Sequence, residues 1–382
     1  MAKLGDICTF QSGGTPSKSN SEYFNGSIPW ITTVALTGDY IDKNDAVDWI
    51  TDKAIQESAA KIVPENSILV GTRVGIGKVA INTVPMSTSQ DIVSLINVDD
   101  TEWDKRFLCK VISARNPYLL SQARGATIKG IKIDTLAKLE IPKIPLNEQR
   151  RIAAVLDKVS GLIAKRREQL DKLDELVKAR FVEMFGDFNS SRTLWSTSKF
   201  GEEFSITSGG TPATGEPAYW ENGNISWIGS NLCQDVILYE NDGKFITQSG
   251  LDHSSAKVFK SGTVLVALVG ATIGKTALLR FDTATNQNVA AINVPENSQF
   301  CSEFIFYELQ MLYWKFQEIG NGKFKMANQR FIRELPTMCP PLELQRQFAD
   351  IVGKVVKSKL TIQQSLDKLE VMKKALMQQY FG

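Results

Sequence analysis

The stretch Ser12-Gly13-Gly14-Thr15-Pro16 returns unchanged as Ser208-Gly209-Gly210-Thr211-Pro212, 196 residues later. Further matches follow in the same order: Trp30-Ile31 returns as Trp227-Ile228, and Phe185-Gly186 returns as Phe381-Gly382. One shared pentapeptide can arise by chance, but collinear matches along the whole length indicate a tandem repeat. The 382 residues therefore contain two copies of one plan rather than two or three different domains.

The composition excludes several classes of protein. With 44 Lys and Arg, 42 Asp and Glu and 43% hydrophobic residues, the chain is typical of a globular protein and not of a disordered one. No apolar run approaches the ~20 residues that a membrane helix needs, and the first residues lack the apolar stretch of a secretory signal. The five cysteines form no close-spaced pairs, which argues against a zinc ribbon or a disulfide framework. We therefore expect a cytoplasmic protein with no metal site and no membrane contact.

Each copy of the repeat has two parts. The first part is rich in Gly, Pro, Thr and short β-branched runs, which predicts a mixed domain of short strands, turns and a few helices. The second part contains no Pro and predicts one long helix. We place the mixed domains at residues 1–145 and 188–340, and the long helices at residues 146–187 and 341–382. The expected fold class is α+β: two similar mixed α/β domains separated by two long antiparallel coiled-coil helices, with an internal pseudo-two-fold repeat.

A heptad seam of apolar residues runs along each predicted long helix, which indicates that the helix packs against another helix. The helices pair with each other in our interpretation; two separate surface helices are the alternative. Because the first helix enters the second domain and the second helix leaves it, a compact domain with its ends close together makes the pair antiparallel. The apolar seam residues that we assign to these interface helices are Ile152, Leu156, Val159, Ile163, Leu170, Leu173, Phe348, Val352, Val355, Ile362, Leu366 and Leu369.

Motifs that suggest catalysis fail on inspection. Residues 270–276 resemble a phosphate-binding loop, but only three residues separate the two glycines where that loop has four. His253 is the only histidine, and it lies in a polar stretch with no equivalent histidine in the first copy. We expect a glycine turn between strands at residues 270–276 and a surface histidine at position 253, and we find no credible catalytic, metal or cofactor site.

The charge is unevenly distributed although the net charge is only +2. Residues 1–104 contain 7 basic and 14 acidic side chains, whereas residues 105–143 contain 9 basic and 2 acidic side chains. The second copy has a similar basic tract at residues 320–333, again shortly before the long helix. A local positive face is what attracts a phosphate backbone, so the tracts favour nucleic-acid binding. A solvated face or loop is the alternative.

The combination resembles the specificity (S) subunit of type I restriction–modification systems. Each domain opens with Ser-Gly-Gly-Thr-Pro, and each long helix begins with Pro-Leu-x-x-Gln, at residues 145–149 and 341–345. The first long helix closes with Phe181-Val182-Glu183-Met184-Phe185-Gly186-Asp187, which looks like the family's helix ending. The second Pro-Leu-x-x-Gln motif has Leu344 where the first has Glu148, but both keep the Gln.

The resemblance implies a non-catalytic specificity subunit. Each mixed domain would be a target-recognition domain that reads one half of a bipartite, asymmetric site on double-stranded DNA, and the helices would fix the gap. The implied partners are two modification (methyltransferase) subunits and the restriction (ATP-dependent translocase/nuclease) subunits. S-adenosylmethionine and ATP with Mg²⁺ are expected in those subunits, and no cofactor is expected in this chain.

We expect DNA contacts from the two basic tracts and, less strongly, from a glycine turn and the opening turns. Thr in an opening turn can bond a phosphate oxygen or only shape the turn. A repeat-built protein–protein adaptor without a DNA role and, less favoured, a nucleotide hydrolase that uses residues 270–276 are the alternative functions. The candidate DNA-binding residues are Arg73, Arg124, Lys129, Lys132, Lys323, Lys325, Gln329, Arg330, Thr15 and Thr211.

Overall fold

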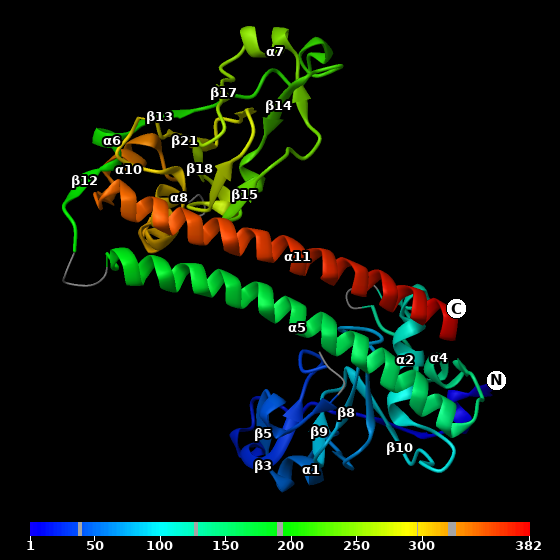
Figure 1. Cartoon of the computed structure of the whole chain (residues 1–382). Coiled ribbons are helices and arrows are strands. Elements are labelled where there is room, and N and C mark those ends of the chain that lie inside the picture. Colours follow the sequence, from blue (N-terminus) through cyan, green and yellow to red (C-terminus); the bar gives the residue numbers. More distant parts are fainter. Residues whose placement is uncertain (37–39, 126–128, 189–193, 296, 320–325) are drawn as a thin grey trace. The chain divides into compact units, whose positions relative to one another are not determined.

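The fold is taken from a computed structural model, which describes residues 1–36, 40–125, 129–188, 194–295, 297–319 and 326–382. The chain divides into two compact units. Unit 1 contains Met1–Arg167 and Gln364–Gly382, and unit 2 contains Glu168–Gln363. Each unit therefore consists of one mixed domain and one part of each long helix (Figure 1).

The mixed domain of unit 1 is built from short strands and short helices. Its strands are β1 (Ala2–Lys3), β2 (Thr9–Ser12), β3 (Phe24–Ile31), β4 (Tyr40–Ile41), β5 (Asp48–Ile50), β6 (Ile62–Val63), β7 (Ile68–Gly71), β8 (Val79–Asn82), β9 (Met86–Thr88), β10 (Ile92–Ile96) and β11 (Glu140–Ile141). Its helices are α1 (Asp52–Glu57), α2 (Lys105–Ala114), α3 (Asn116–Ser121) and α4 (Ile133–Ala137). In the described residues one sheet has the order β2-β10-β7-β8-β4 and another has the order β5-β3-β9-β6, while β1 pairs with β11.

The mixed domain of unit 2 repeats this plan. Its strands are β12 (Thr197–Lys199), β13 (Ser205–Ser208), β14 (Ile225–Ile228), β15 (Val236–Leu238), β16 (Phe245–Ile246), β17 (Val258–Phe259), β18 (Val264–Ala267), β19 (Thr276–Leu279), β20 (Thr283–Thr285), β21 (Val289–Asn293) and β22 (Pro336–Met338). Its helices are α6 (Phe200–Glu203), α7 (Gln248–Asp252), α8 (Ser302–Met311), α9 (Tyr313–Gln317) and α10 (Gln329–Glu334). The sheet orders, β13-β21-β18-β19-β15 and β16-β14-β20-β17 with β12 beside β22, match those of unit 1 strand for strand.

The central strand of each larger sheet is buried on both faces. In β7, Ile68 and Val70 pack into the cluster that contains α2, whereas Leu69 packs into a second cluster with Ile31 and Met86 of the other sheet. Successive side chains of a strand point to opposite faces, so a continuous apolar run is needed where both faces are covered. β18 in unit 2 divides its side chains between two clusters in the same way.

Both long helices have 40 residues: α5 is Leu146–Phe185 and α11 is Leu342–Phe381. All twelve of the apolar seam residues named above are buried or half-buried. In unit 1, the start of α5 packs with the end of α11, and Arg167 Nη2 lies 2.7 Å from Glu370 Oε1. In unit 2, the end of α5 packs with the start of α11, and Lys359 Nζ lies 2.6 Å from Asp174 Oδ1. The two helices are therefore antiparallel within each unit, as predicted.

The Pro-Leu-x-x-Gln motif holds two loops together through its buried glutamine. Gln149 Nε2 donates to the carbonyl oxygens of Glu102 and Ile144, both at 2.9 Å, and Gln149 Oε1 accepts from the Asp104 backbone N–H at 3.0 Å. In unit 2, Gln345 makes the same three bonds, all 2.9 Å long, to Gln299, Pro340 and Cys301. The glutamine thus ties the segment before α2 or α8 to the start of the long helix.

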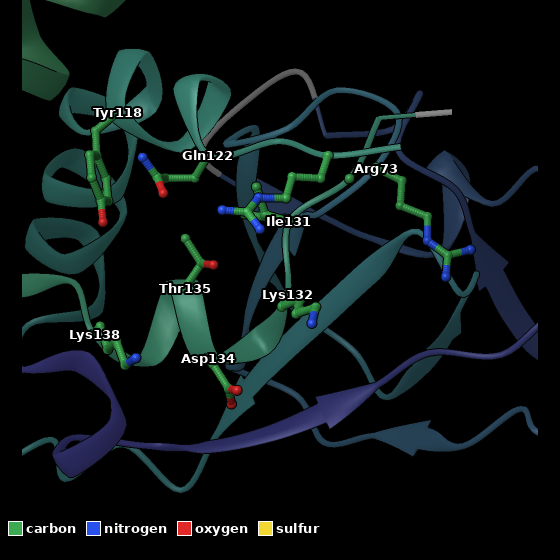
Figure 2. Close-up of a pocket in the computed structure, with 10 residues that line it drawn as sticks. Arg73, Tyr118, Gln122, Ile131, Lys132, Asp134, Thr135 and Lys138 are labelled. Atoms are coloured by element: carbon green, nitrogen blue, oxygen red, sulfur yellow. The ribbon is translucent and has the colours of Figure 1, made fainter. Parts of the chain in front are cut away.

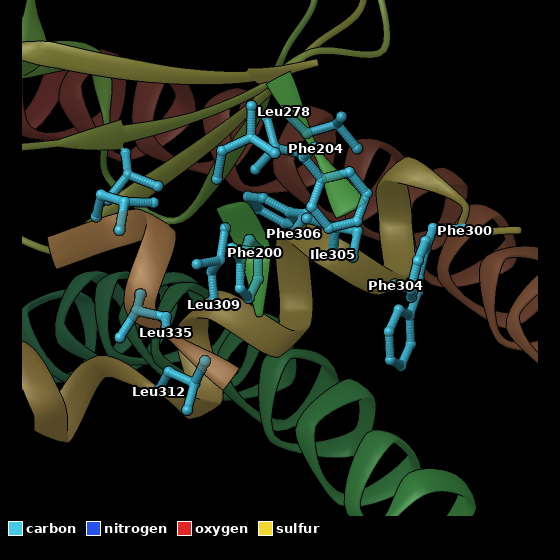
Figure 3. Close-up of a cluster of buried hydrophobic side chains, with 14 of the residues drawn as sticks. Phe200, Phe204, Leu278, Phe300, Phe304, Ile305, Phe306, Leu309, Leu312 and Leu335 are labelled. Carbon is cyan, nitrogen blue, oxygen red and sulfur yellow. The ribbon is translucent and has the colours of Figure 1, made fainter. Parts of the chain in front are cut away.

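The core of unit 2 is rich in phenylalanine, and Figure 3 shows part of it around α8. Phe304 of α8 lies 4.8 Å from Phe185 and 5.5 Å from Phe181, measured between ring centroids. Both partners lie in the last turns of α5, so this helix ends in the core of the second domain. In the described part of the chain, no helix is long and apolar enough to cross a membrane.

Candidate nucleic-acid interface

The Ser-Gly-Gly-Thr-Pro turn occupies the same place in both domains. The Gly14 N–H donates to the Thr88 carbonyl at 2.8 Å, and the buried Trp30 indole donates to the Gly14 carbonyl at 3.1 Å. A Cβ atom on Gly14 would collide with the backbone of Ala59. This close approach explains why the position is glycine. In unit 2, Gly210 and the Trp227 indole make the corresponding bonds at 2.8 and 3.0 Å.

Each turn presents a threonine that bonds an exposed glutamine. The Thr15 hydroxyl donates to Gln90 Oε1, and the Thr211 hydroxyl donates to Gln287 Oε1 at 2.7 Å. Gln90 and Gln287 follow β9 and β20 and are exposed. Gln90 and Gln287 recur at corresponding positions of the repeat, but neither is among the DNA-binding residues predicted from the sequence. The threonines therefore have a partner inside their own domain.

A cavity of about 680 Å³ in unit 1 brings together three of the predicted DNA-binding residues, Arg73, Arg124 and Lys132. Lys138 supplies a fourth cation, and Asp134 is the acidic residue of the lining. Figure 2 shows Tyr118 and Gln122 on one side of this cavity and Arg73 on the opposite side. The remaining lining residues are Gly130, Ile131 and Thr135.

Hydrogen bonds of the backbone place these cations side by side. Arg124 and Gly130 exchange two backbone hydrogen bonds of 2.9 Å, which close a loop between them. The Ile131 N–H then donates to the Thr72 carbonyl at 2.8 Å and fixes the loop against the residue before Arg73. Residue 73 is far in the sequence from residues 124 and 132, so the bond between Ile131 and Thr72 rather than local spacing brings Arg73 to the same positive surface.

Other candidates lie apart from the cavity lining or outside the described residues. Lys129 is exposed on the loop that Arg124 and Gly130 close. In unit 2, Arg330 is exposed, whereas Gln329 donates to the Ser208 hydroxyl at 2.9 Å and accepts from Arg333 at 3.3 Å. Gln329 thus holds α10 against the opening turn of its domain. Lys323 and Lys325 lie outside the described residues.

The structure assigns the rejected motifs to ordinary structural roles. Gly270 and Gly274 have φ values of +76° and +78° in the connection between β18 and β19. Lys275 pairs with Asp235 at 2.6 Å, and the same carboxylate accepts from the Thr276 N–H at 3.0 Å. The groups that a phosphate-binding loop would turn toward a nucleotide are therefore bonded within the domain. His253 is exposed at the end of α7.

Comparison with protein families decides the relationship. The model of the type I restriction modification DNA specificity domain matches residues 1–174 and again residues 193–371. The chain belongs to this family. The two matches coincide with the tandem repeat, because each covers one mixed domain and most of the long helix that follows it.

Curated specificity subunits are similar to the chain. The type I restriction enzyme MjaIX specificity subunit of Methanocaldococcus jannaschii is 28% identical over 282 residues, which is 69% of this chain and 65% of that protein. The EcoR124I/EcoR124II specificity subunit of Escherichia coli is 32% identical over 185 residues, 47% of this chain and 45% of that protein. The matches thus span about two thirds and about half of the length of these relatives.

Solved structures of specificity subunits share the fold. The type I restriction-modification S subunit from M. genitalium superposes with a TM-score of 0.60 at 17% identity, covering 98% of this chain and 94% of the other. A chain from a structure of type I restriction–modification complex assembly and conformational transition gives 0.59 at 19% identity, covering 100% and 96%. The α+β fold with a repeated domain and two long helices is therefore that of the S subunits.

Proposed function

We propose that this protein is the DNA-recognition subunit of a type I restriction–modification complex. Each mixed domain reads one half of a bipartite, asymmetric site on double-stranded DNA, and the helices fix the gap between the halves. The observation that carries the proposal is the cavity where Arg73, Arg124, Lys132 and Lys138 converge.

The chemistry of this cavity suits a DNA duplex. Four cationic side chains around one hollow attract phosphates, and the release of counterions supplies much of the binding free energy. Gln122 and the Arg side chains can also reach base edges in a groove. Tyr118 is exposed beside them and offers a ring and a hydroxyl group. The adaptor alternative is supported by no comparable feature.

The proposed partners carry the catalytic chemistry of the complex. Two modification subunits bind S-adenosylmethionine and carry the methyltransferase activity. Restriction subunits bind ATP with Mg²⁺ and carry the nuclease activity. The repeat supports two modification subunits, because two similar domains offer quasi-equivalent surfaces. A chain with this role acts beside genomic DNA in the cytoplasm.

The salt dependence of duplex binding tests the proposal. In the assembled complex, Lys132→Ala should weaken binding for every sequence and reduce the slope of log affinity against log salt by about one. Lys172→Ala removes an exposed charge from α5, far along the sequence from the cavity residues, and should leave the slope unchanged. A complex that assembles but protects no duplex would favour the adaptor function.

A further inference from the structure

We propose that Gln90 and Gln287 are DNA-contacting residues that each donate an amide N–H to a backbone phosphate, and that Thr15 and Thr211 are their positioning residues. The proposal rests on the proposed function, because it requires a DNA duplex on this face. It adds a contact that is shared by the two domains and that involves no charged side chain of the protein.

The two Thr–Gln pairs have the same arrangement in the two domains. In each, a hydroxyl of the opening turn donates to the glutamine Oε1 across 75 or 76 residues of sequence. Both glutamines are exposed. A side-chain amide has two N–H donors besides its oxygen. Among the described residues, neither Gln90 nor Gln287 has a recorded protein partner for these donors.

The turn that holds each threonine is rigid. Gly14 is fixed by the Thr88 carbonyl and the Trp30 indole, and there is no room for a side chain at its Cα. Gly210 is fixed in the same way in unit 2. A rigid turn limits the entropy lost when the glutamine amide is held in one orientation, which favours binding by preorganisation.

Gln90 lies next to the candidate interface of unit 1. Asp91 follows Gln90, its carbonyl accepts from the Thr72 N–H at 2.8 Å, and its carboxylate lies 3.8 Å from Arg73. Arg73 lines the basic cavity. In unit 2, the Asn288 carbonyl likewise accepts from the Leu268 N–H at 2.8 Å. Gln90 therefore precedes a residue that is bonded to the end of β7 beside Arg73, and Gln287 precedes a residue that is bonded to the equivalent end of β18.

The likeness of the two pairs favours a phosphate over a base. Around the pair the domains differ, since unit 2 has Asn288 where unit 1 has Asp91, and Val269 where unit 1 has Arg73. Contacts that read sequence should differ between domains that read different half-sites. Contacts that position the duplex carry no sequence information and can be shared.

Duplex binding by the full complex tests the inference. Gln90→Ala and Gln287→Ala should each weaken binding about five- to ten-fold, equally for the cognate site and for sites with substituted bases. The salt slope should not change, because an amide displaces no counterion. Gln90→Lys should restore affinity and raise the slope by about one. Gln379→Ala, at an exposed glutamine near the end of α11, is the matched control and should bind as the wild type does.

The threonine variants separate positioning from contact. Thr15→Val should cause part of the loss seen with Gln90→Ala, Thr15→Ser should restore binding, and adding Thr15→Val to Gln90→Ala should have no further effect. If the wild-type complex binds DNA and the Gln variants bind equally well, the inference is wrong while the proposed function stands. A loss confined to the cognate base pair would overturn the phosphate contact in favour of base reading. A wild-type complex that binds no duplex would refute the proposed function itself.

Discussion

Phe381, the last helical residue of α11, packs edge-on against Phe107 of α2, with the ring centroids 5.6 Å apart. In unit 2, Phe185 at the end of α5 meets Phe304 of α8 in the same edge-on manner at 4.8 Å. These are equivalent positions of the repeat, so each long helix begins at its own domain and ends in the core of the other. The stability of each domain therefore depends on both helices.

Truncating either ring should destabilise one unit more than the other. Phe381→Ala removes a buried ring from unit 1 and should cost about 3–5 kcal/mol of its free energy of unfolding, while Phe185→Ala should do the same in unit 2. Hydrogen exchange followed by mass spectrometry should show faster exchange in α2 for the first variant and in α8 for the second. Equal acceleration in both helices would contradict the assignment, and Phe381→Leu should have a smaller effect.

The buried glutamines should be intolerant of apolar replacement. Gln149→Leu leaves the Asp104 N–H and two carbonyl groups without their partner, so we expect a loss of about 1–3 kcal/mol in urea unfolding. Gln345→Leu should behave alike in unit 2. The exposed Gln347→Leu is the control, and a similar loss there would mean that helix propensity, not the buried bonds, is responsible.

Glu308 should make unit 2 less stable as the pH rises. Burial raises the pKa of this carboxyl to about 8, against the opposing effect of hydrogen bonds from the Met338 N–H and the Thr337 hydroxyl. In the unfolded chain the Glu308 carboxyl ionises near pH 4.5. The free energy of unfolding of unit 2 therefore falls between about pH 4.5 and 8 and is lowest above that range.

Glu308→Gln stays neutral and should unfold at a higher temperature than the wild type at pH 8 to 9. The difference should vanish near pH 4, where the wild-type carboxyl is protonated in both states. Thermal melts across this pH range measure the effect, and Glu318→Gln at an exposed site should show none of it. A difference between Glu308→Gln and wild type that is constant with pH would rule out ionisation as the cause.

A methyl group at the opening turn should disturb both folding and DNA binding. Gly210→Ala would collide with Ser255 and displace the turn that carries Thr211, at a cost of about 1–3 kcal/mol. Gly215→Ala, five residues later, meets no atom within 4 Å and should be neutral. Thermal unfolding and duplex affinity of the two variants, compared in the assembled complex, test this expectation. Equal behaviour would show that the turn tolerates a side chain.

The sequence predicted the repeat and the long helices because both depend on local or collinear signals. The seam from Ile152 to Leu369 follows from periodicity alone. The pairing of strands did not follow, since β3 and β9 are parallel neighbours with more than 50 residues between them. A strand as short as the three-residue β9 carries too little pattern to specify such a partner, and the register is set by the packing of both sheet faces.

The candidate site was predictable in part. Arg124 and Lys132 were chosen from a basic tract and Arg73 from its glycine turn, but the Ile131–Thr72 backbone bond that brings Arg73 to the same cavity joins distant segments. Gln149 and Gln345 were recognised as part of a motif, whereas their buried hydrogen bonds to two backbone segments could be seen only in the structure. Gln90 and Gln287 were visible as repeated residues; their similar spacing from Thr15 and Thr211, 75 and 76 residues, was the signal that could have identified them.

The pairing of β1 with β11 has one more consequence. Ala2 lies opposite Ile141 beside the start of α5, just as Thr197 lies opposite Met338 beside the start of α11. In the sequence β12 is the first strand after α5, whereas β1 is the first and α11 the last of the described elements. A circular permutant that joins α11 to β1 through a linker and opens the chain between α5 and β12 would keep the β1–β11 and β12–β22 pairings. The order of the two mixed domains along the chain is thus not dictated by the fold.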